Sequence, residues 1–184
     1  MDNWLDRPAD TLPYKLVPGL EQTGDYQEFE GVLPLEQLYR GRQLYRIEGG
    51  IAYKLNLTNT GSGVLLQGTA KAAGTSECAR CLEDAAFEVE GDVEGYYLLN
   101  PTEEELQQLD DEITAVGSDG MVDLWGHVTA AIIFELPQVL LCKADCAGLC
   151  PDCGINLNEG SCNCAQGIKP DHPFAGLQGF MVDN

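Results

Sequence analysis

The amino-acid sequence predicts an α+β fold, in which an antiparallel β-sheet or a partly open barrel is covered by one or two helices and followed by a cysteine-rich C-terminal region. Three observations predict it. Apolar and polar residues alternate along three segments between residues 45 and 97, as in strands with one buried face. Residues 122–136 instead carry apolar side chains at helical spacing, and strands followed by a helix are typical of α+β domains. Six of the eight cysteines lie between residues 142 and 164.

Residues 1–20 are expected to form an extended N-terminal arm. They contain Pro8, Pro13 and Pro18 and show little periodicity, which fits the edge of a sheet better than its interior. The first six residues lack the basic region and apolar run of a signal peptide, and no stretch reaches the roughly 20 apolar residues that span a bilayer. We therefore expect a cytoplasmic protein without membrane contact.

The first predicted hairpin begins at Tyr45. Apolar residues recur at every second position up to Leu57, and Gly49-Gly50 is expected to bend or bulge this strand. A turn at residues 59–63 leads into a second strand over residues 64–72.

The third predicted strand has one apolar face and one acidic face. In a strand, alternate residues point to opposite sides, so one face should be core and the other a ladder of carboxylates. The core face comprises Phe87, Val89, Val93 and Tyr97, and the other comprises Glu88, Glu90, Asp92 and Glu94.

Two helical segments are expected after the strands. Residues 102–112 form a short acidic helix or an insertion, in which Thr102 is a candidate N-cap. A longer amphipathic helix follows Asp123, ends at Pro137 and covers one side of the sheet. Its apolar residues are Val122, Trp125, Val128, Ile132 and Leu136.

The cysteines indicate a metal site, because a reducing compartment disfavours structural disulfides and clustered thiols there are more often ligands or redox groups. Cys150-Pro-Asp-Cys153-Gly154 has the form of a zinc knuckle, a tight turn that directs two sulfurs at one ion. Cys162 and Cys164 are two residues apart, so in an extended segment both point to the same side. We expect these four thiols to share one zinc ion.

The remaining thiols are Cys78, Cys81, Cys142 and Cys146, which complete a second site in a protein that binds two ions. Other groupings are also open, for instance Cys78/Cys81 sharing an ion with Cys150/Cys153. The spacing identifies which cysteines form a close pair better than it identifies which two pairs bind the same ion. Either grouping would join the hairpin to the tail across a long loop and make the zinc structural.

Other chemistries compete with one or two zinc ions. A Cys-x-x-Cys pair can be a redox couple, but that chemistry favours a helix N-terminus, and iron also accepts four thiolates. His127 and His172 are expected to be ordinary packing or surface residues. No carboxylate pair and no nucleophilic serine stands out, so we expect no enzyme, no catalytic residue and no small-molecule substrate.

The net charge of −20, from 30 acidic and 10 basic residues, points to a basic partner. Such a field repels a polyphosphate and attracts cationic surfaces, which disfavours direct RNA binding. High net charge that serves only solubility is the competing explanation.

Several motifs resemble the YceD family, whose members are also described as large ribosomal RNA subunit accumulation proteins. The matching pieces are Cys78-Ala-Arg80-Cys81-Leu82, Leu136-Pro137, the run from Cys142 through Cys150-Pro-Asp-Cys153-Gly154-Ile-Asn156-Leu-Asn158, and Asp171-His-Pro-Phe-Ala-Gly-Leu177. The resemblance implies a role in producing or stabilising large-subunit ribosomal RNA, and it carries no established enzymatic activity. Arg80 is expected to organise the knuckle rather than contact a partner.

Together these features predict an arm at residues 1–20, a β domain with covering helix at 21–141, and a zinc-binding tail at 142–184 packed on it. The leading hypothesis is an acidic zinc-binding protein that binds a basic ribosomal protein or assembly factor. A zinc-ribbon protein that contacts precursor ribosomal RNA directly and a thiol redox switch remain as alternatives.

Overall fold

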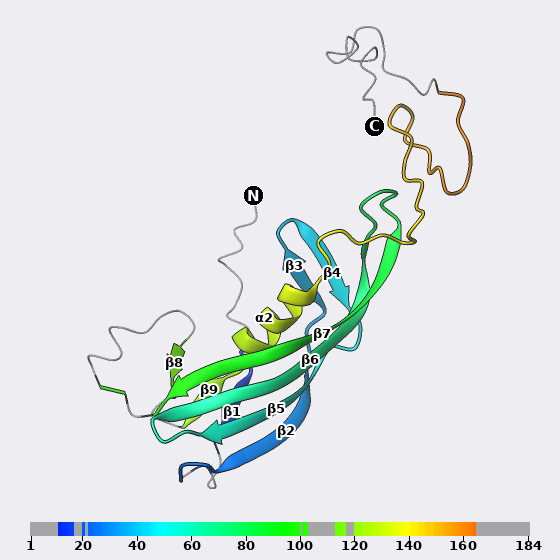
Figure 1. Ribbon diagram of the computed structural model, residues 1–184. Coiled ribbons are helices and arrows are strands. Elements are labelled where there is room, and N and C mark those ends of the chain that lie inside the picture. Colours follow the sequence, from blue (N-terminus) through cyan, green and yellow to red (C-terminus); the bar gives the residue numbers. More distant parts are fainter. Residues whose placement is uncertain are drawn as a thin grey trace, which may run out of the picture.

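The computed structural model describes residues 11–16, 20, 22–99, 101–102, 113–116 and 120–164. Within them an open sheet of seven strands, a sheet of two strands and one helix form an elongated body (Figure 1). The seven strands are β2 (Tyr26–Leu33), β3 (Gln37–Arg40), β4 (Gln43–Ile47), β5 (Ile51–Asn59), β6 (Gly63–Glu77), β7 (Asp84–Leu98) and β8 (Ile113–Ala115). The small sheet joins β1 (Pro13–Lys15) to β9 (Met121–Asp123), and the helix is α2 (Trp125–Glu135).

Strand β6 organises the main sheet, because both of its edges are paired. Strand β7 runs antiparallel along one edge over the full length of β6, from Gly63 opposite Leu98 to Glu77 opposite Asp84. The other edge pairs with both β5 and β4, which in turn pair with β2 and β3. All of these pairs are antiparallel, and only the short β8 lies parallel to β7 among the described strands. The antiparallel sheet with a covering helix agrees with the expected fold class.

The segment from residue 45 to 57 forms two strands rather than the single bent strand that the alternation predicted. Both β4 and β5 run antiparallel to β6 along the same edge, and the Glu48 N–H still donates to the Ala73 carbonyl. Between them Gly49 and Gly50 have φ values of +75° and +83°, which end the extended conformation. A Cβ at Gly50 would lie 2.5 Å from the Leu33 carbonyl oxygen, so the chain needs glycine there.

Helix α2 begins at Trp125, close to the expected start after Asp123, but Val122 does not belong to it although the apolar spacing included this residue. Val122 lies instead in β9, where it pairs with Tyr14 of β1. The Asp123 carboxylate accepts hydrogen bonds from the N–H groups of Trp125 at 3.0 Å and Leu12 at 2.8 Å. It therefore ties the start of the helix to the small sheet. The last helical hydrogen bond reaches Leu136, and the next residue is proline.

The core lies between the inner face of the sheet and α2. Phe87, Val93 and Tyr97 of β7 are buried, whereas Glu88, Glu90, Asp92 and Glu94 are exposed, as the parity of the sequence predicted. The fully buried side chains that fill this layer are Tyr45, Ile51, Leu55, Leu57, Val64, Leu66, Val93, Tyr97, Leu124, Val128, Ile132 and Leu136.

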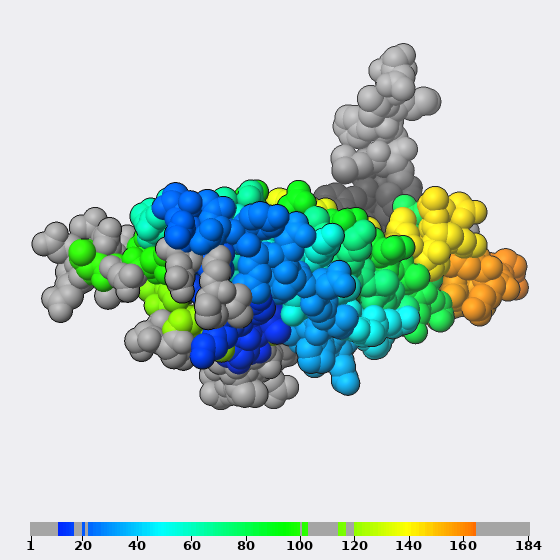
Figure 2. All heavy atoms as spheres, turned by 90° about the horizontal axis from the view of Figure 1, so that it is seen from below, coloured from blue at the N-terminus to red at the C-terminus, as the bar shows by residue number. Residues whose placement is uncertain are grey.

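The described part of the cysteine-rich tail, residues 142–164, forms one end of the body. It follows α2 and lies beyond the tip of the β6–β7 hairpin (Figures 1 and 2). In the part of the chain that the structure describes, no helix combines the length and apolar character needed to cross a bilayer. Residues 103–112 of the expected acidic helix, His172 and the motif at residues 171–177 lie outside the described residues.

Candidate metal centres

All eight cysteines lie in two groups of four, and every sulfur in a group lies within 4.8 Å of the others. We call Cys78, Cys81, Cys142 and Cys146 the hairpin cluster, and Cys150, Cys153, Cys162 and Cys164 the tail cluster. The exchanged grouping that sequence alone leaves open does not occur. All eight thiols are free.

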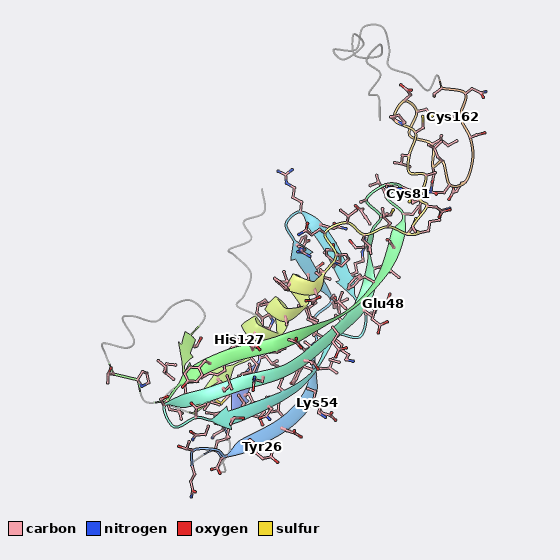
Figure 3. The ribbon with its side chains drawn as sticks, in the orientation of Figure 1. Tyr26, Glu48, Lys54, Cys81, His127 and Cys162 are labelled. Atoms are coloured by element: carbon pink, nitrogen blue, oxygen red, sulfur yellow. The ribbon has the colours of Figure 1, made fainter. Side chains whose placement is uncertain are left out.

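The hairpin cluster joins the tip of the β6–β7 hairpin to the chain that leaves α2 (Figure 3). Sγ of Cys78 lies 3.8 Å from Sγ of Cys146, and Sγ of Cys81 lies 3.6 Å from Sγ of Cys142 across 61 positions of sequence. The Ala79 N–H donates to the Leu140 carbonyl at 2.8 Å. Three of the four cysteines are buried, and Cys142 is exposed.

The tail cluster lies farther from the sheet and is more exposed. Cys150 is buried, Cys162 and Cys164 are half-buried, and Cys153 is exposed. Sγ of Cys162 lies 3.4 Å from Sγ of Cys150. A β-bridge between Leu149 and Asn156, supported by a 2.8 Å hydrogen bond from Cys150 N–H to the Ile155 carbonyl, closes the knuckle.

Both Cys-x-x-Cys turns have the same backbone geometry. In the tail, Gly154 has φ +74° and donates its N–H to the Cys150 carbonyl at 2.9 Å. At the hairpin tip, Leu82 has φ +63° and donates to the Cys78 carbonyl at 3.0 Å. Among the described residues Leu82 is the only non-glycine with positive φ, a conformation that costs a leucine about 1–2 kcal/mol. The chain therefore accepts local strain to place Cys81 beside Cys78.

The first cysteine of each knuckle ionises easily. Burial would raise the pKa of Cys78, but backbone N–H groups that point at its sulfur outweigh this and lower the pKa to about 6. Hydrogen bonds from the N–H groups of Cys153 and Asp152 lower the pKa of Cys150 to about 6. The pKa of Cys142 is raised to about 12, chiefly by its hydrogen bond with Cys81. Some thiols of a cluster are thus easy to ionise and others hard, so a full set of four thiolates is disfavoured without a cation.

The geometry and the donor atoms fit a tetrahedral metal ion. With zinc–sulfur bonds of about 2.3 Å, tetrahedral sulfurs lie about 3.8 Å apart. The Sγ–Sγ distances of 3.4–3.8 Å in the two clusters are close to that spacing and much longer than a disulfide bond of about 2.05 Å. Four thiolates suit zinc or iron, and a closed four-thiolate site is typical of a structural ion. When bound, such an ion would supply a cross-link between distant segments.

Two further residues organise the centres. The Arg80 guanidinium donates to the Cys146 carbonyl at 2.9 Å, which supports the expected structural role of this residue. Asn158 links the clusters, since its Nδ2 lies 3.3 Å from Sγ of Cys146 and its Oδ1 accepts the Ala147 N–H at 2.9 Å. The sequence signal for Asn158 was the Asn-x-Asn run after the knuckle, whose contact with the other cluster only the structure reveals.

His127 is a packing residue. It lies on α2, half-buried against β7, with its ring 5.4 Å from that of Tyr97 in an edge-to-face arrangement (Figure 3). Burial lowers the pKa of His127, which keeps the ring neutral near pH 7.

The outer face of the sheet is strongly acidic. Strand β7 contributes Glu88, Glu90, Asp92 and Glu94, and β2 contributes Glu28 and Glu30 on the same side. Lys71 pairs with Glu90 at 2.9 Å, and Lys54 lies opposite Glu30 in the register. In the described part of the chain, Glu88, Asp92 and Glu94 have no ion-pair partner. This row of carboxylates on β7, from Glu88 to Glu94, is called the acidic row below.

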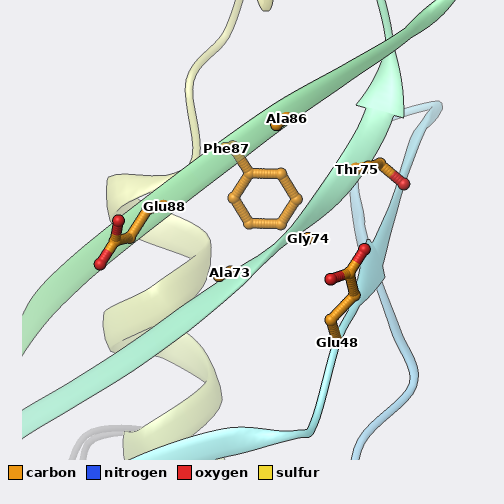
Figure 4. Close-up of a pocket in the computed structure, with 7 residues that line it drawn as sticks. All are labelled: Glu48, Ala73, Gly74, Thr75, Ala86, Phe87 and Glu88. Atoms are coloured by element: carbon orange, nitrogen blue, oxygen red, sulfur yellow. The ribbon is translucent and has the colours of Figure 1, made fainter.

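A shallow hollow of about 360 Å³ adjoins the acidic row (Figure 4). Glu48 and Glu88 lie on opposite sides of it, and Phe87 and Gly74 lie between them. Small residues, Ala73, Thr75 and Ala86, complete the lining. An aliphatic stem with a cationic head, as in lysine or arginine, would suit this combination of apolar floor and flanking carboxylates.

Comparison with known proteins identifies relatives. The family model described as "Large ribosomal RNA subunit accumulation protein YceD" matches residues 66–181. An uncharacterized protein of Mycobacterium tuberculosis is 33% identical over 119 residues, which cover 64% of this chain and 57% of that protein. An uncharacterized protein of Mycobacterium leprae is 30% identical over 135 residues, 72% of this chain and 58% of that protein.

A plant relative carries a functional name. The large ribosomal RNA subunit accumulation protein YCED homolog 1, chloroplastic, of Zea mays is 35% identical over 66 residues, which cover 33% of this chain and 22% of that protein. The chain thus spans a little over half the length of the mycobacterial relatives it matches. No solved structure matches the chain significantly.

Proposed function

Because the chain belongs to the YceD family of large ribosomal RNA subunit accumulation proteins, we propose that it supports accumulation of large-subunit ribosomal RNA in the cytoplasm without catalysing a reaction. The family assignment rests on a match that extends over residues 66–181, more than half of the chain, and includes both cysteine clusters. The shared name of the plant relative supports the same role.

The observation that carries the molecular proposal is the acidic row beside the hollow. A positively charged partner would be attracted by the whole field of the protein and held where carboxylates lack their own cations. We therefore propose that the outer face of the sheet binds a basic ribosomal protein or a basic assembly factor. Bare RNA would meet the same carboxylates as a repulsive surface.

The two cysteine clusters would give this face a fixed frame. We propose that each cluster binds one zinc ion. In this arrangement the chain consists of an arm of residues 1–20, a β domain of residues 21–141, and a tail of residues 142–184 that zinc attaches to the β domain. Two cysteines of the hairpin cluster, Cys78 and Cys81, lie at the tip of the β6–β7 hairpin, and the outer side of the same hairpin carries the acidic row. Zinc in the hairpin cluster would therefore stiffen the surface that meets the partner.

The test uses purified basic ribosomal proteins and the full chain at increasing salt. The variant Glu88→Gln/Asp92→Asn/Glu94→Gln removes three unpaired charges from the acidic row. Exposed ion pairs contribute about 0.2–1 kcal/mol each, so binding should weaken about tenfold at low salt. The difference should shrink as salt rises, because exposed charges are screened.

The control removes three exposed carboxylates elsewhere, Glu83→Gln/Asp145→Asn/Glu159→Gln, and should bind like the unaltered chain. Equal weakening by both variants would show that net charge alone attracts the partner and would refute the docking face. Tight binding to bare precursor ribosomal RNA, strongest at low salt and independent of any protein, would favour the RNA-binding alternative instead.

A further inference from the structure

The two cysteine clusters are connected by a very short piece of chain. Cys146 belongs to the hairpin cluster and Cys150 to the tail cluster, so only Ala147, Gly148 and Leu149 separate the two. In so short a connection, a change in the backbone at one cluster must reach the other, provided that further contacts hold the connection rigid.

Two backbone hydrogen bonds provide that rigidity. Leu149 N–H donates to the Arg80 carbonyl at the hairpin tip at 3.1 Å, and Leu157 N–H donates to the Gly148 carbonyl at 2.8 Å. Gly148 has φ +76°, and a Cβ there would lie 3.1 Å from the Arg80 carbonyl oxygen. The connection is thus packed between the hairpin on one side and the turn at residues 156–158 on the other.

Asn158 adds a direct contact from the tail loop to a ligand of the hairpin cluster. Its Nδ2 donates to Sγ of Cys146 at 3.3 Å, so a residue of the tail loop contacts a sulfur of the hairpin cluster directly. The same amide is held by Asn156, whose Oδ1 accepts from Nδ2 at 2.9 Å and from the Asn158 N–H at 3.0 Å. Both asparagines lie in the loop between Cys153 and Cys162, which the tail cluster closes at its two ends.

We propose that the two metal sites are thermodynamically coupled through Asn158. An ion in the tail cluster fixes the loop that aims the Asn158 amide at Cys146, and the hydrogen bond to that sulfur then holds Cys146 in the orientation in which it faces the other three sulfurs of the hairpin cluster. Hydrogen bonds to ligand atoms commonly change metal affinity by about 10–100-fold. By linkage, an ion in the hairpin cluster strengthens the tail cluster by the same factor.

The coupling has a consequence for metal loss. Three of the tail cysteines are exposed or half-buried, whereas three of the hairpin cysteines are buried. The tail ion is therefore the more accessible to a chelator, and its removal loosens the ion that holds the hairpin. The inference rests on the proposal that both clusters bind metal.

The experiment measures zinc affinities of the full chain by competition with a chromogenic chelator. Cys153→Ser leaves the hairpin cluster alone and gives its affinity, and Cys81→Ser likewise gives that of the tail cluster. The coupling factor is the overall two-ion constant of the unaltered chain divided by the product of these two constants. We expect a factor of about ten.

Asn158 is tested by repeating the three measurements in an Asn158→Asp background. Asp keeps the oxygen that accepts the Ala147 N–H but replaces the donor with a negative oxygen, so the factor should fall to about one. Asn158→Ala, which removes the donor without adding charge, should give the same result. Asn163→Asp adds the same charge between two tail ligands, where Asn163 is exposed and makes no hydrogen bond to a described residue, and should leave the factor near ten.

Each outcome decides a separate point. Two bound ions with a factor of one overturn the coupling while leaving the proposed zinc sites intact. A factor near ten that survives both Asn158 substitutions excludes Asn158 as the connection. A chain that binds no ion at all, while circular dichroism shows an intact sheet, overturns the zinc part of the proposed function together with the coupling.

Discussion

Loss of the hairpin cluster should destabilise the whole sheet, but only when metal is present. The substitution is Cys81→Ser, which removes one sulfur from the tip of the β6–β7 hairpin. In the unfolded chain, an ion that gathers the four thiols must close the 61-residue separation between Cys81 and Cys142. The folded chain already holds these sulfurs 3.6 Å apart.

The magnitude follows from that loop. Closing about 60 residues costs about 4 kcal/mol of chain entropy, so with zinc in excess the folded state should gain about this much over the unfolded state. For a chain of this size, about 4 kcal/mol corresponds to a Tm change of about 8–16 °C. The tail cluster bridges only 12 positions between Cys150 and Cys162, and its loop lies outside the sheet. Cys153→Ser should therefore change the Tm of the sheet far less.

The assay is thermal unfolding followed by circular dichroism, with excess zinc and again with a chelator. We expect Cys81→Ser to lower Tm strongly with zinc and only slightly with chelator, where one buried thiol becomes a hydroxyl at a cost of about 1 kcal/mol. An equal loss of Tm in both conditions would mean that Cys81 acts through packing. A larger loss for Cys153→Ser would contradict the loop argument.

Three further predictions concern pH, backbone strain and packing. Because the pKa values of Cys78 and Cys150 are lowered to about 6, folding favours their thiolates. This stabilisation of the metal-free chain is complete above the ordinary thiol pKa of about 9 and is lost as pH falls through 6. The part of the thiolate absorbance that comes from Cys78 and Cys150 should titrate near pH 6 in the folded chain and near 9 in urea; the absence of any titration near pH 6 in the folded chain would contradict the N–H contacts. Leu82→Gly should stabilise the chain relative to Leu82→Ala by about 1 kcal/mol in urea unfolding, because only glycine adopts φ +63° without strain; equal stability of the two variants would show that the turn is relaxed. Ile132→Ala should lower the free energy of unfolding by about 2–5 kcal/mol, since Ile132 is fully buried beneath the sheet, whereas Phe134→Ala at an 80% exposed position should change it by no more than about 0.5 kcal/mol. Similar losses for the two variants would mean that α2 does not bury the face that carries Ile132.

Much of the fold could be predicted because its signals are local. The alternation of Phe87, Glu88, Val89 and Glu90 predicted a strand with one buried face, since neighbouring residues of a strand point to opposite sides. Where local pattern and distant pairing disagreed, the pairing prevailed. Val122 continues the helical spacing of α2, but its backbone pairs with Tyr14, more than 100 residues earlier in the chain.

The sequence by itself determined that the segments within β5, β6 and β7 are strands, that α2 is a helix, and that the cysteines form four close pairs, because spacings of two to four residues constrain geometry within a single turn or strand. Only the tertiary structure decided which pairs share a site, how β4 and β5 divide one edge of β6, and that Asn158 reaches Cys146. These features depend on segments that are far apart in the chain or belong to different turns. Their contacts are set by how the β6–β7 hairpin, α2 and the tail pack together, and no short spacing encodes that packing.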